Sequence, residues 1–232
     1  MNTEFSVPSA TEKYLSSRDA LRAQAKAKFF AHNPNAAPLV ASINDYVATS
    51  LLGLSGQDTR PVPNGPYVGA LIISFVRTHF IIIDLVTCCE LIEAATLLRK
   101  QFELLARLKE LRTSETIEHL LRRTPNLSTL ETPIKTLYGM YSEIAHSSTP
   151  EWLELLGRIE QSGEPKLHVY PAFDKNAYVA LSHVAHTVFE YYIWAHQFFC
   201  ENFPNYSKDW AEEWLFDAIQ KMNSYLPEAE CN

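Results

Sequence analysis

Glycine is scarce in this sequence, which has only seven glycines among 232 residues. That is about half of the usage in average soluble domains. Folds with many tight turns and loops that bind phosphate closely both depend on glycine. The scarcity therefore argues against turn-dense β folds and glycine-rich phosphate loops, and it favours helices.

Familiar catalytic motifs are absent as well. The sequence contains no Walker A loop, no dinucleotide-binding fingerprint after a strand, no nucleophile elbow and no Cys-x-x-Cys pair. It also shows no internal repeat with the period of a solenoid. None of the common motifs for nucleotide hydrolysis, hydride transfer or ester hydrolysis therefore accounts for its function.

Cysteine is equally sparse and shows no disulfide spacing. The four cysteines are Cys88, Cys89, Cys200 and Cys231, and the adjacent pair has poor geometry for a mutual bridge. The first seventeen residues contain charged side chains and lack the apolar core of a secretory signal. We therefore expect a cytoplasmic protein.

The composition is that of a soluble globular protein, with 47% apolar and 20% charged residues. Acidic residues outnumber basic ones by 27 to 20, which gives a formal net charge of -7. The surface as a whole therefore does not attract phosphate, and any contact with nucleic acid has to be local.

The most apolar stretch of the chain extends from Tyr67 to Val86 and contains Arg77, His79 and Asp84. Each charge at the centre of a membrane helix costs about 2.5 to 3.5 kcal/mol of insertion free energy. Two such charges offset most of the gain from the apolar side chains. We expect a buried helix and no membrane span.

A long helical region forms the centre of the expected fold, because residues 70–124 contain neither glycine nor proline. A single helix from Tyr67 to Arg112 would be about 69 Å long, whereas a compact chain of this size has a radius of gyration of about 17 Å. We therefore expect a break near Asp84 to Glu90. After it, apolar residues recur at helical spacing, namely Leu91, Ala94, Ala95, Leu98, Phe102, Leu105 and Leu108.

The fold class predicted from these patterns is all-α, a helical bundle with extra N- and C-terminal helices. We expect residues 1–66 to form an N-terminal helical extension and residues 67–232 to form the bundle. A short strand or extended loop is expected only at Lys166 to Asp174. Further helices are expected at Thr11–Ala31, Ala37–Leu54, Glu115–Arg123, Pro133–His146, Pro150–Gln161 (started by Thr149-Pro150-Glu151), Asn176–Asn202 and Lys208–Tyr225.

Three polar side chains line one edge of the helix expected at Pro133–His146. Tyr138, Ser142 and His146 are spaced four residues apart, so two hydroxyls and an imidazole stack along the border of its apolar face. His146 lies in the last turn, where it either caps the final carbonyls or serves a binding or catalytic site.

A second set of polar residues lies on the preceding long helix. Arg99, Glu103 and Arg107 are also four residues apart and can form a charge ladder. One interpretation is a solvated ladder with a small effect on stability. The other is an arginine at the edge of the apolar stripe that turns toward a site.

A third set, His183, His186 and Glu190, shares one side of the last long helix. Two imidazoles and a carboxylate are donors used at iron and zinc sites. Because no fourth ligand is indicated, we predict no metal and no cofactor. Aromatic residues on this same helix are expected to belong to the core or to a dimer interface.

Two of these patterns together resemble the HEPN superfamily, and in particular bacterial members with similar helices. The residues that carry the resemblance are Leu97-Leu98-Arg99-x-x-x-Glu103 and Tyr138-x-x-Tyr141-Ser142-x-x-x-His146-Ser147, followed by a long aromatic helix, within about Asp84 to Asn202. The resemblance implies a HEPN-like helical bundle, often dimeric. Many members are metal-independent endoribonucleases of toxin or antiviral systems, and others only bind nucleotides or proteins.

The resemblance implies catalytic roles for His146, Arg99 and Glu103, and binding roles for Tyr138, Ser142 and Arg107. One departure is clear, because the RNase motif has an arginine four to six residues before its histidine. This chain has Gly139, Met140 and Tyr141 in that region. The cation would then have to come from Arg99 or Arg107 on the neighbouring helix.

Three functions therefore remain open at this point, because a helical metalloenzyme that uses His183, His186 and Glu190 stays an alternative to the two that follow. The first is a HEPN-like effector that binds RNA or nucleotides, and its catalytic form is an endoribonuclease. This function predicts that the polar residues converge in one cleft, at a homodimer axis. The second is a non-catalytic helical dimerisation or protein-interaction module. It predicts a buried His146 and a large apolar dimer surface.

Overall fold

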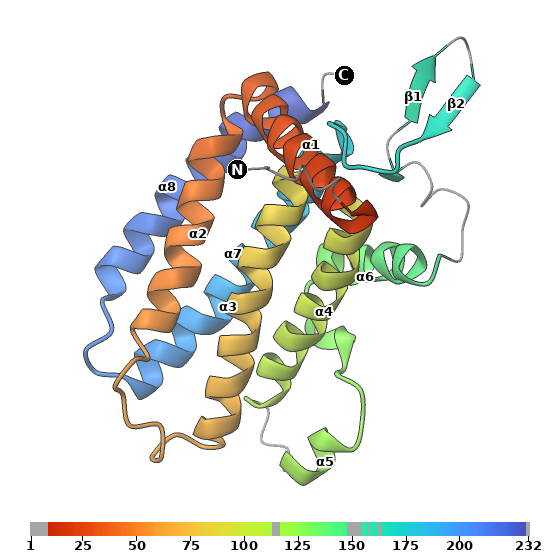
Figure 1. Ribbon diagram of the computed structural model, residues 1–232. Helices are drawn as coiled ribbons and strands as arrows, with labels where there is room; N and C mark the ends of the chain where they lie inside the picture. The colour runs from red at the N-terminus through yellow and green to blue at the C-terminus, as the bar shows by residue number, and fades with distance from the viewer. Residues whose placement is uncertain (1–8, 113–116, 148–154, 157, 162–163, 231–232) are drawn as a thin grey trace, which may run out of the picture.

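The computed structural model describes residues 9–112, 117–147, 155–156, 158–161 and 164–230. Within these ranges the chain forms eight α-helices and one short β-hairpin, which confirms an all-α helical bundle. Figure 1 shows α2, α3, α4, α7 and α8 side by side, with α1 across one end and α6 beside α4. The elements are α1 (Ala10–His32), α2 (Ala36–Leu52), α3 (Gly65–Thr87), α4 (Leu91–Glu110), α5 (Ile117–Leu121), α6 (Thr132–Ala145), β1 (Arg158–Gln161), β2 (Glu164–Leu167), α7 (Asn176–Asn202) and α8 (Lys208–Glu230).

The break expected between α3 and α4 is present. Helix α3 ends at Thr87, α4 begins at Leu91, and Cys89 between them has a φ of 60°. A backbone in the left-handed region cannot continue a right-handed helix, so the chain reverses within three residues. The two helices then pack antiparallel along their length (Figure 1).

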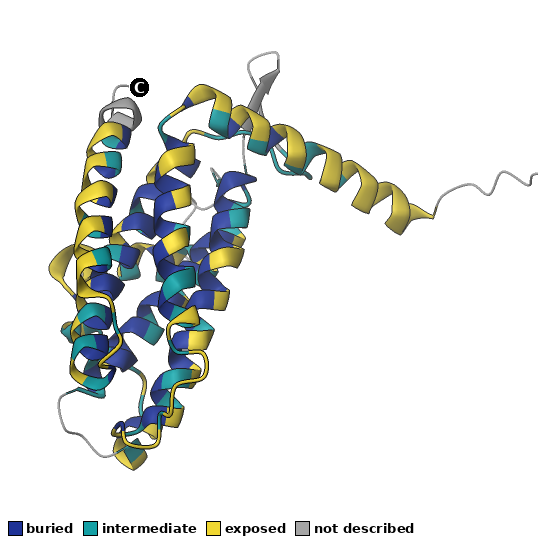
Figure 2. Ribbon diagram, turned by 90° about the vertical axis from the view of Figure 1, so that its left-hand side faces the viewer, coloured by how far each residue is buried: buried dark blue, intermediate teal, exposed yellow. Residues whose placement is uncertain are grey.

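The hydrophobic core lies between the five parallel and antiparallel helices, as Figure 2 shows by the dark blue faces turned inward. Helical spacing places apolar side chains of each helix on its inner face. The predicted stripe of α4 is buried, since each of its seven residues is at most 4% exposed. Large side chains with almost no exposure fill the centre: Tyr46, Phe75, Phe102, Ile43, Ile72, Leu98, Leu105 and Tyr191.

Helix α2 packs against α3, α7 and α8 and contributes to the same core, whereas α1 buries only Ala25 and Phe29. Helix α1 is held at the corner between α3 and α4, where Arg22 forms ion pairs with Asp84 and Glu90. The predicted division of the chain into an N-terminal helical extension (1–66) and a helical bundle (67–232) stays a prediction.

The expected helix Pro150–Gln161 is wrong where the structure describes it. Residues Arg158–Gln161 form β1, which pairs antiparallel with β2 at Glu164–Leu167. Two glycines at 157 and 163 and a proline at 165 disfavour a helix here. The proposed helix start at Thr149-Pro150-Glu151 lies outside the described residues. The short strand or extended loop expected at Lys166–Asp174 is present, since the first two residues belong to β2 and the others form the connection to α7.

Within the described part of the chain, α3 alone is long and apolar enough to cross a membrane, with a mean hydropathy of 1.8. Half of its most apolar window is buried inside the protein. Core helices of soluble proteins have the same features, so this is weak support for a span. The absence of a membrane stays a prediction.

His79 is the fully buried histidine of α3, with an exposed fraction of 0%. Its Nε2 lies 2.8 Å from Oδ1 of Asn44, and its Nδ1 has no partner among the described residues. A carboxamide oxygen only accepts, so the ring proton is on Nε2. Burial lowers the pKa of His79 from 6.5 to about 3, because the apolar core disfavours the imidazolium.

This histidine makes the stability of the fold depend on pH. Its pKa is lower in the folded state, so the unfolded state binds the proton first, and stability is lost as pH falls from about 6.5 toward 3. We expect His79→Leu to reduce the loss of unfolding free energy between pH 6 and 4.5 by about 2 kcal/mol. Urea unfolding at the two pH values measures it. His32→Leu, at an exposed site, is the control, and equal pH slopes for wild type and His79→Leu would contradict the prediction.

Candidate functional site

Helices α4 and α6 pack against each other and bring the two predicted polar sets together. Nη1 of Arg99 on α4 lies 3.0 Å from Nε2 of His146, the residue that follows α6. The two residues are 47 positions apart in the chain. The structure therefore brings the guanidinium of Arg99 and the imidazole of His146 into contact, and their predicted roles stay predictions.

Tyr138 and Glu103 complete this cluster. Nε of Arg99 donates to the hydroxyl of Tyr138 at 3.2 Å, and that hydroxyl donates to Oε1 of Glu103 at 2.9 Å. Arg99 also lies 3.5 Å from the same carboxylate oxygen and 5.4 Å from the centre of the Tyr138 ring. Four of the six predicted site residues thus form one connected network.

The contact between Arg99 and His146 fixes the form of the imidazole. A guanidinium has only donors, so Nε2 of His146 has to be the acceptor. The ring is then neutral in this arrangement, with its proton on Nδ1. Nε2 is consequently the nitrogen whose lone pair is directed at the cluster.

The network lies at the protein surface. His146 is exposed, and the side chains of Arg99 and Glu103 are 25% and 35% exposed. Ser142 is half-buried one turn before His146, and its carbonyl accepts from the backbone N–H of His146. A ligand can therefore approach the imidazole and the guanidinium directly. The buried His146 expected for an interaction module is wrong.

Arg107 is not brought to the cluster. It is buried, and its Nη1 lies 2.9 Å from Oε2 of Glu110, while Nη2 donates to the carbonyl of Arg123. The carboxylate of Glu110 also accepts from the backbone N–H of Asn126 at 2.8 Å. Arg107 thus fixes the chain that follows α5, and Arg99 is the arginine that faces His146.

The third polar set, His183, His186 and Glu190, does not form one site, because each of its members contacts other residues. Nδ1 of His183 lies 2.8 Å from the hydroxyl of Tyr141, and Nδ1 of His186 lies 2.8 Å from the carbonyl of Ser182. Burial, with a smaller effect from His186, lowers the pKa of His183 to about 4. Across the described ranges, no three histidine, cysteine or acidic side chains are grouped so that they could hold a metal ion.

Glu190 positions the site from a distance, a role that sequence reasoning did not assign to it. Its buried carboxylate lies 2.5 Å from Nζ of Lys109 on α4 and accepts from the backbone N–H of Glu131 at 2.9 Å, directly before α6. One side chain of α7 therefore fixes the start of α6 against α4. The sequence did contain one signal for this role of Glu190, namely a carboxylate within an apolar helical face. Such groups are rarely buried without partners.

Comparison with protein-family models, curated proteins and solved structures finds no match for this chain. The resemblance to the HEPN superfamily accordingly stays a prediction that rests on the residues named above.

The tautomer of His146 is a direct test of this geometry. We expect wild-type His146 to carry its proton on Nδ1, because Arg99 donates to Nε2. In Arg99→Ala this donor is lost, and the population shifts toward the form with the proton on Nε2. Long-range ¹H–¹⁵N correlation spectra of the ring distinguish the two forms.

Lys100→Ala is the matched control, because it removes a positive charge from the neighbouring exposed position of α4. Its spectrum should equal that of the wild type. A wild-type ring protonated on Nε2, or no change on loss of Arg99, would contradict the geometry.

Proposed function

We propose that this protein binds RNA at the surface formed by α4 and α6 and cleaves it without a metal ion, as a HEPN-like endoribonuclease. The observation that carries the proposal is the 3.0 Å contact between Arg99 and His146. It places a phosphate-binding cation beside a group that can transfer protons. This is the pair that the RNase motif requires, with the arginine supplied by the neighbouring helix.

Metal-independent cleavage of RNA needs a base for the 2′-hydroxyl, an acid for the leaving oxygen and a cation for the phosphate. The neutral ring of His146 has on Nε2 the electron pair that a base needs, and this pair becomes available when Nη1 of Arg99 turns from the imidazole to the phosphate. Arg99 uses two of its five N–H donors in contacts with Tyr138 and His146. Donors of the same guanidinium therefore remain for the oxygens of a phosphate.

In the proposed step, Nε2 of His146 takes the proton of a 2′-hydroxyl while that oxygen forms a bond to phosphorus. The bond from phosphorus to the 5′-oxygen breaks, and its electron pair stays on that oxygen. The 5′-oxygen takes a proton from the imidazolium of a second copy of the chain. The products are a 2′,3′-cyclic phosphate and a 5′-hydroxyl, and proton exchange with water restores both rings.

Glu103 and Tyr138 are positioning residues in this scheme. The hydroxyl of Tyr138 lies between the carboxylate and Nε of Arg99, so it holds the guanidinium at the edge of α4. The charge of Glu103 offsets the cost of holding a cation at a partly buried position. Arg99 is therefore held in place before a substrate arrives, which lowers the entropy that binding has to offset.

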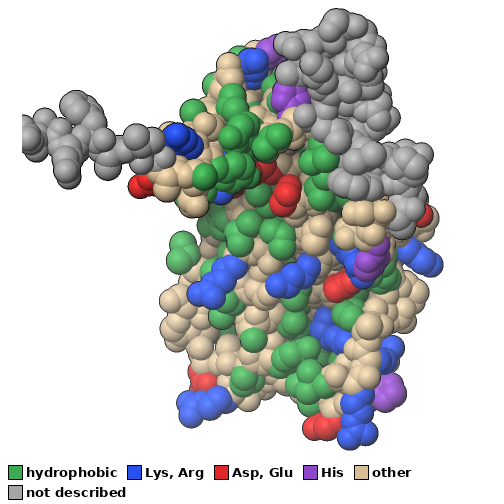
Figure 3. Space-filling model, turned by 45° about the vertical axis from the view of Figure 1, so that its right-hand side comes forward, with side chains coloured by type: hydrophobic (Ala, Val, Ile, Leu, Met, Phe, Trp, Pro, Cys, Tyr) green, Lys and Arg blue, Asp and Glu red, His purple; other side chains and the backbone are tan. Residues whose placement is uncertain are grey.

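The whole chain has a negative net charge, but the side of the molecule with α4, α5 and α6 carries basic side chains that could bind a polyanion. Figure 3 shows several lysine and arginine side chains, with acidic side chains between them, on the side where α4, α5 and α6 lie. Contacts with phosphates there are local, as a net charge of -7 requires.

A homodimer is part of the proposal, because one His146 cannot be base and acid in the same step. Such a dimer would bring two copies of the α4–α6 surface together about a twofold axis. Sedimentation at micromolar concentrations tests it, and a strictly monomeric species would remove the mechanism with two histidines.

A non-catalytic interaction module is the second candidate, and one observation favours it. The outward face of α3 exposes Ile73, Phe80 and Ile81, with exposed fractions of 42%, 39% and 52%. Apolar side chains clustered on one helix face are common at protein interfaces. This surface would bind a partner whether or not the pair Arg99–His146 acts on RNA.

Degradation of single-stranded RNA in the presence of EDTA tests the catalytic proposal. We expect His146→Ala to lower the rate by about 100-fold or more, since a proton-transferring group contributes about 10²- to 10⁴-fold. Arg99→Ala should lower it by about 100- to 1,000-fold, through loss of charge stabilisation at the phosphate.

Two matched variants serve as controls. Lys208→Ala removes an exposed positive charge from α8, outside the α4–α6 surface, and His32→Ala removes an exposed histidine from α1, far from the cluster in sequence. Both should cleave RNA as the wild type does. Equal activity of wild type and His146→Ala would exclude the catalytic proposal and leave the interaction module.

A further inference from the structure

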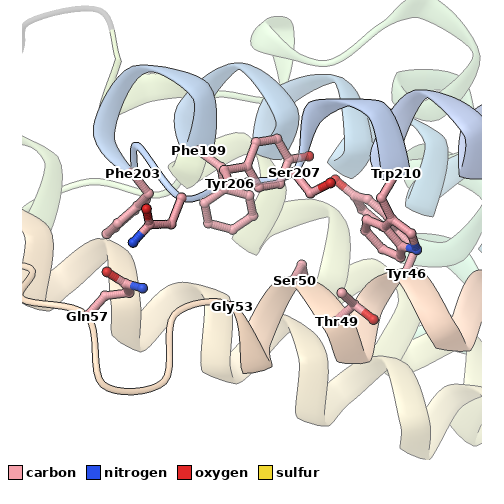
Figure 4. Close-up of a pocket in the computed structure, with 11 residues that line it drawn as sticks. Tyr46, Thr49, Ser50, Gly53, Gln57, Phe199, Phe203, Tyr206, Ser207 and Trp210 are labelled. Atoms are coloured by element: carbon pink, nitrogen blue, oxygen red, sulfur yellow. The ribbon is translucent and has the colours of Figure 1, made fainter.

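A cavity of about 410 Å³ lies between α2, the end of α7 and the start of α8. Figure 4 shows side chains from α2 on one side and from the α7–α8 connection on the other, directed toward one another. Phe203 and Gln57 lie at one end, and Tyr46 and Trp210 at the opposite end. The volume falls within the range of about 300 to 1,000 Å³ that is typical of small-molecule sites.

The lining of this cavity is aromatic and uncharged. Phe199, Phe203, Tyr206, Tyr46 and Trp210 supply rings, and the described lining residues include no acidic or basic side chain. The rings support one another, since Tyr46 and Trp210 are stacked with centroids 5.9 Å apart and Phe199 and Tyr206 are 5.3 Å apart. The smaller residues of the lining are Thr49, Ser50, Gly53, Asn205 and Ser207.

The two buried hydroxyls of the lining, those of Tyr46 and Ser50, lie against other side chains. Tyr46 is 1% exposed, and its hydroxyl is buried beside that of Tyr206, which lies 3.2 Å from Nδ1 of His196. Ser50 is satisfied by the carbonyl of Val47 and the hydroxyl of Tyr191. A ligand in the cavity therefore gains mainly from contacts with the aromatic rings.

We propose that this cavity binds a neutral, mainly apolar aromatic molecule. The aromatic lining matches the apolar body of the ligand, and stacking and edge contacts orient it. The absence of charged groups from the lining disfavours an ionised ligand, whose desolvation nothing would offset. The inference is independent of any activity of Arg99 and His146.

A ligand in this cavity would join segments that are far apart in the chain. Thr49 lies in the last turn of α2 and Gly53 directly follows it, whereas Tyr206 lies in the α7–α8 connection and Trp210 in the first turn of α8. Binding to the folded state alone raises the unfolding temperature. The site would therefore stabilise the packing of α2 against α7 and α8 when it is filled.

Titration of the full chain with the fluorophore Prodan tests the proposal. Prodan is neutral, has a naphthalene ring and carries one carbonyl oxygen. We expect one probe to bind per chain, with increased emission and a higher unfolding temperature. Thr49→Phe fills the cavity from α2 and should weaken binding at least tenfold, and Ser207→Phe should do the same from the opposite wall.

A further variant separates the cavity from other surfaces. Ala41→Phe adds the same ring at an exposed position of α2 outside the lining, and it should bind Prodan as the wild type does.

A pair of probes that differ by one charge tests the selectivity. N-phenyl-1-naphthylamine is neutral, and 1-anilinonaphthalene-8-sulfonate has the same rings with a sulfonate. We expect at least tenfold tighter binding of the neutral probe. Equal binding of the two, equal binding of Prodan to wild type and both filled variants, or no binding of Prodan at all would each overturn the proposal.

Discussion

The buried carboxylate of Glu190 is the contact on which the arrangement of the site depends. It joins Lys109 of α4 to the backbone N–H of Glu131, directly before α6, and it does so from α7. A carboxylate that is 4% exposed is stable only with such partners. Removal of one member of a buried pair typically costs about 3 to 5 kcal/mol. The direction of α6 is therefore set at its first turn by an interaction far from the exposed histidine at its end.

Helix α6 extends from this anchor to the surface, and polar side chains along it contact α4 and α7. Tyr141 meets the half-buried His183, and Tyr138 meets Arg99 and Glu103 one turn earlier in the chain. The histidines likewise differ in burial. Burial lowers the pKa of His79 and of His183, so both stay neutral near pH 7, whereas His146 is exposed beside a guanidinium. Polar groups in the core thus stabilise packing, and the exposed pair remains available for a ligand.

Much of the fold follows from local patterns. The helix at Asn176–Asn202 was predicted with its observed bounds, and the break near Asp84 to Glu90 followed from the length of an unbroken helix. The hairpin at Arg158–Leu167 was missed, because an acceptable helix start at residues 149–151 outweighed two glycines and a proline beyond it. In short segments without strong periodicity, local propensities are too small to decide between helix and strand. Local sequence patterns also do not show which apolar faces pack against each other.

The sequence by itself determined which helices form and which polar residues share one edge of a helix, because both depend on 3.6-residue periodicity and on glycine and proline. Only the tertiary structure decided which arginine serves the site. Arg99 and Arg107 are each four residues from Glu103, yet Arg99 bonds with Tyr138 and His146 while Arg107 is buried with Glu110. The cavity beside Tyr46 was equally out of reach, since its lining comes from segments about 150 residues apart. Which side chains meet at a site or line a cavity depends on the angles at which the helices cross and on the desolvation of each side chain. Both are set by the packing of distant segments.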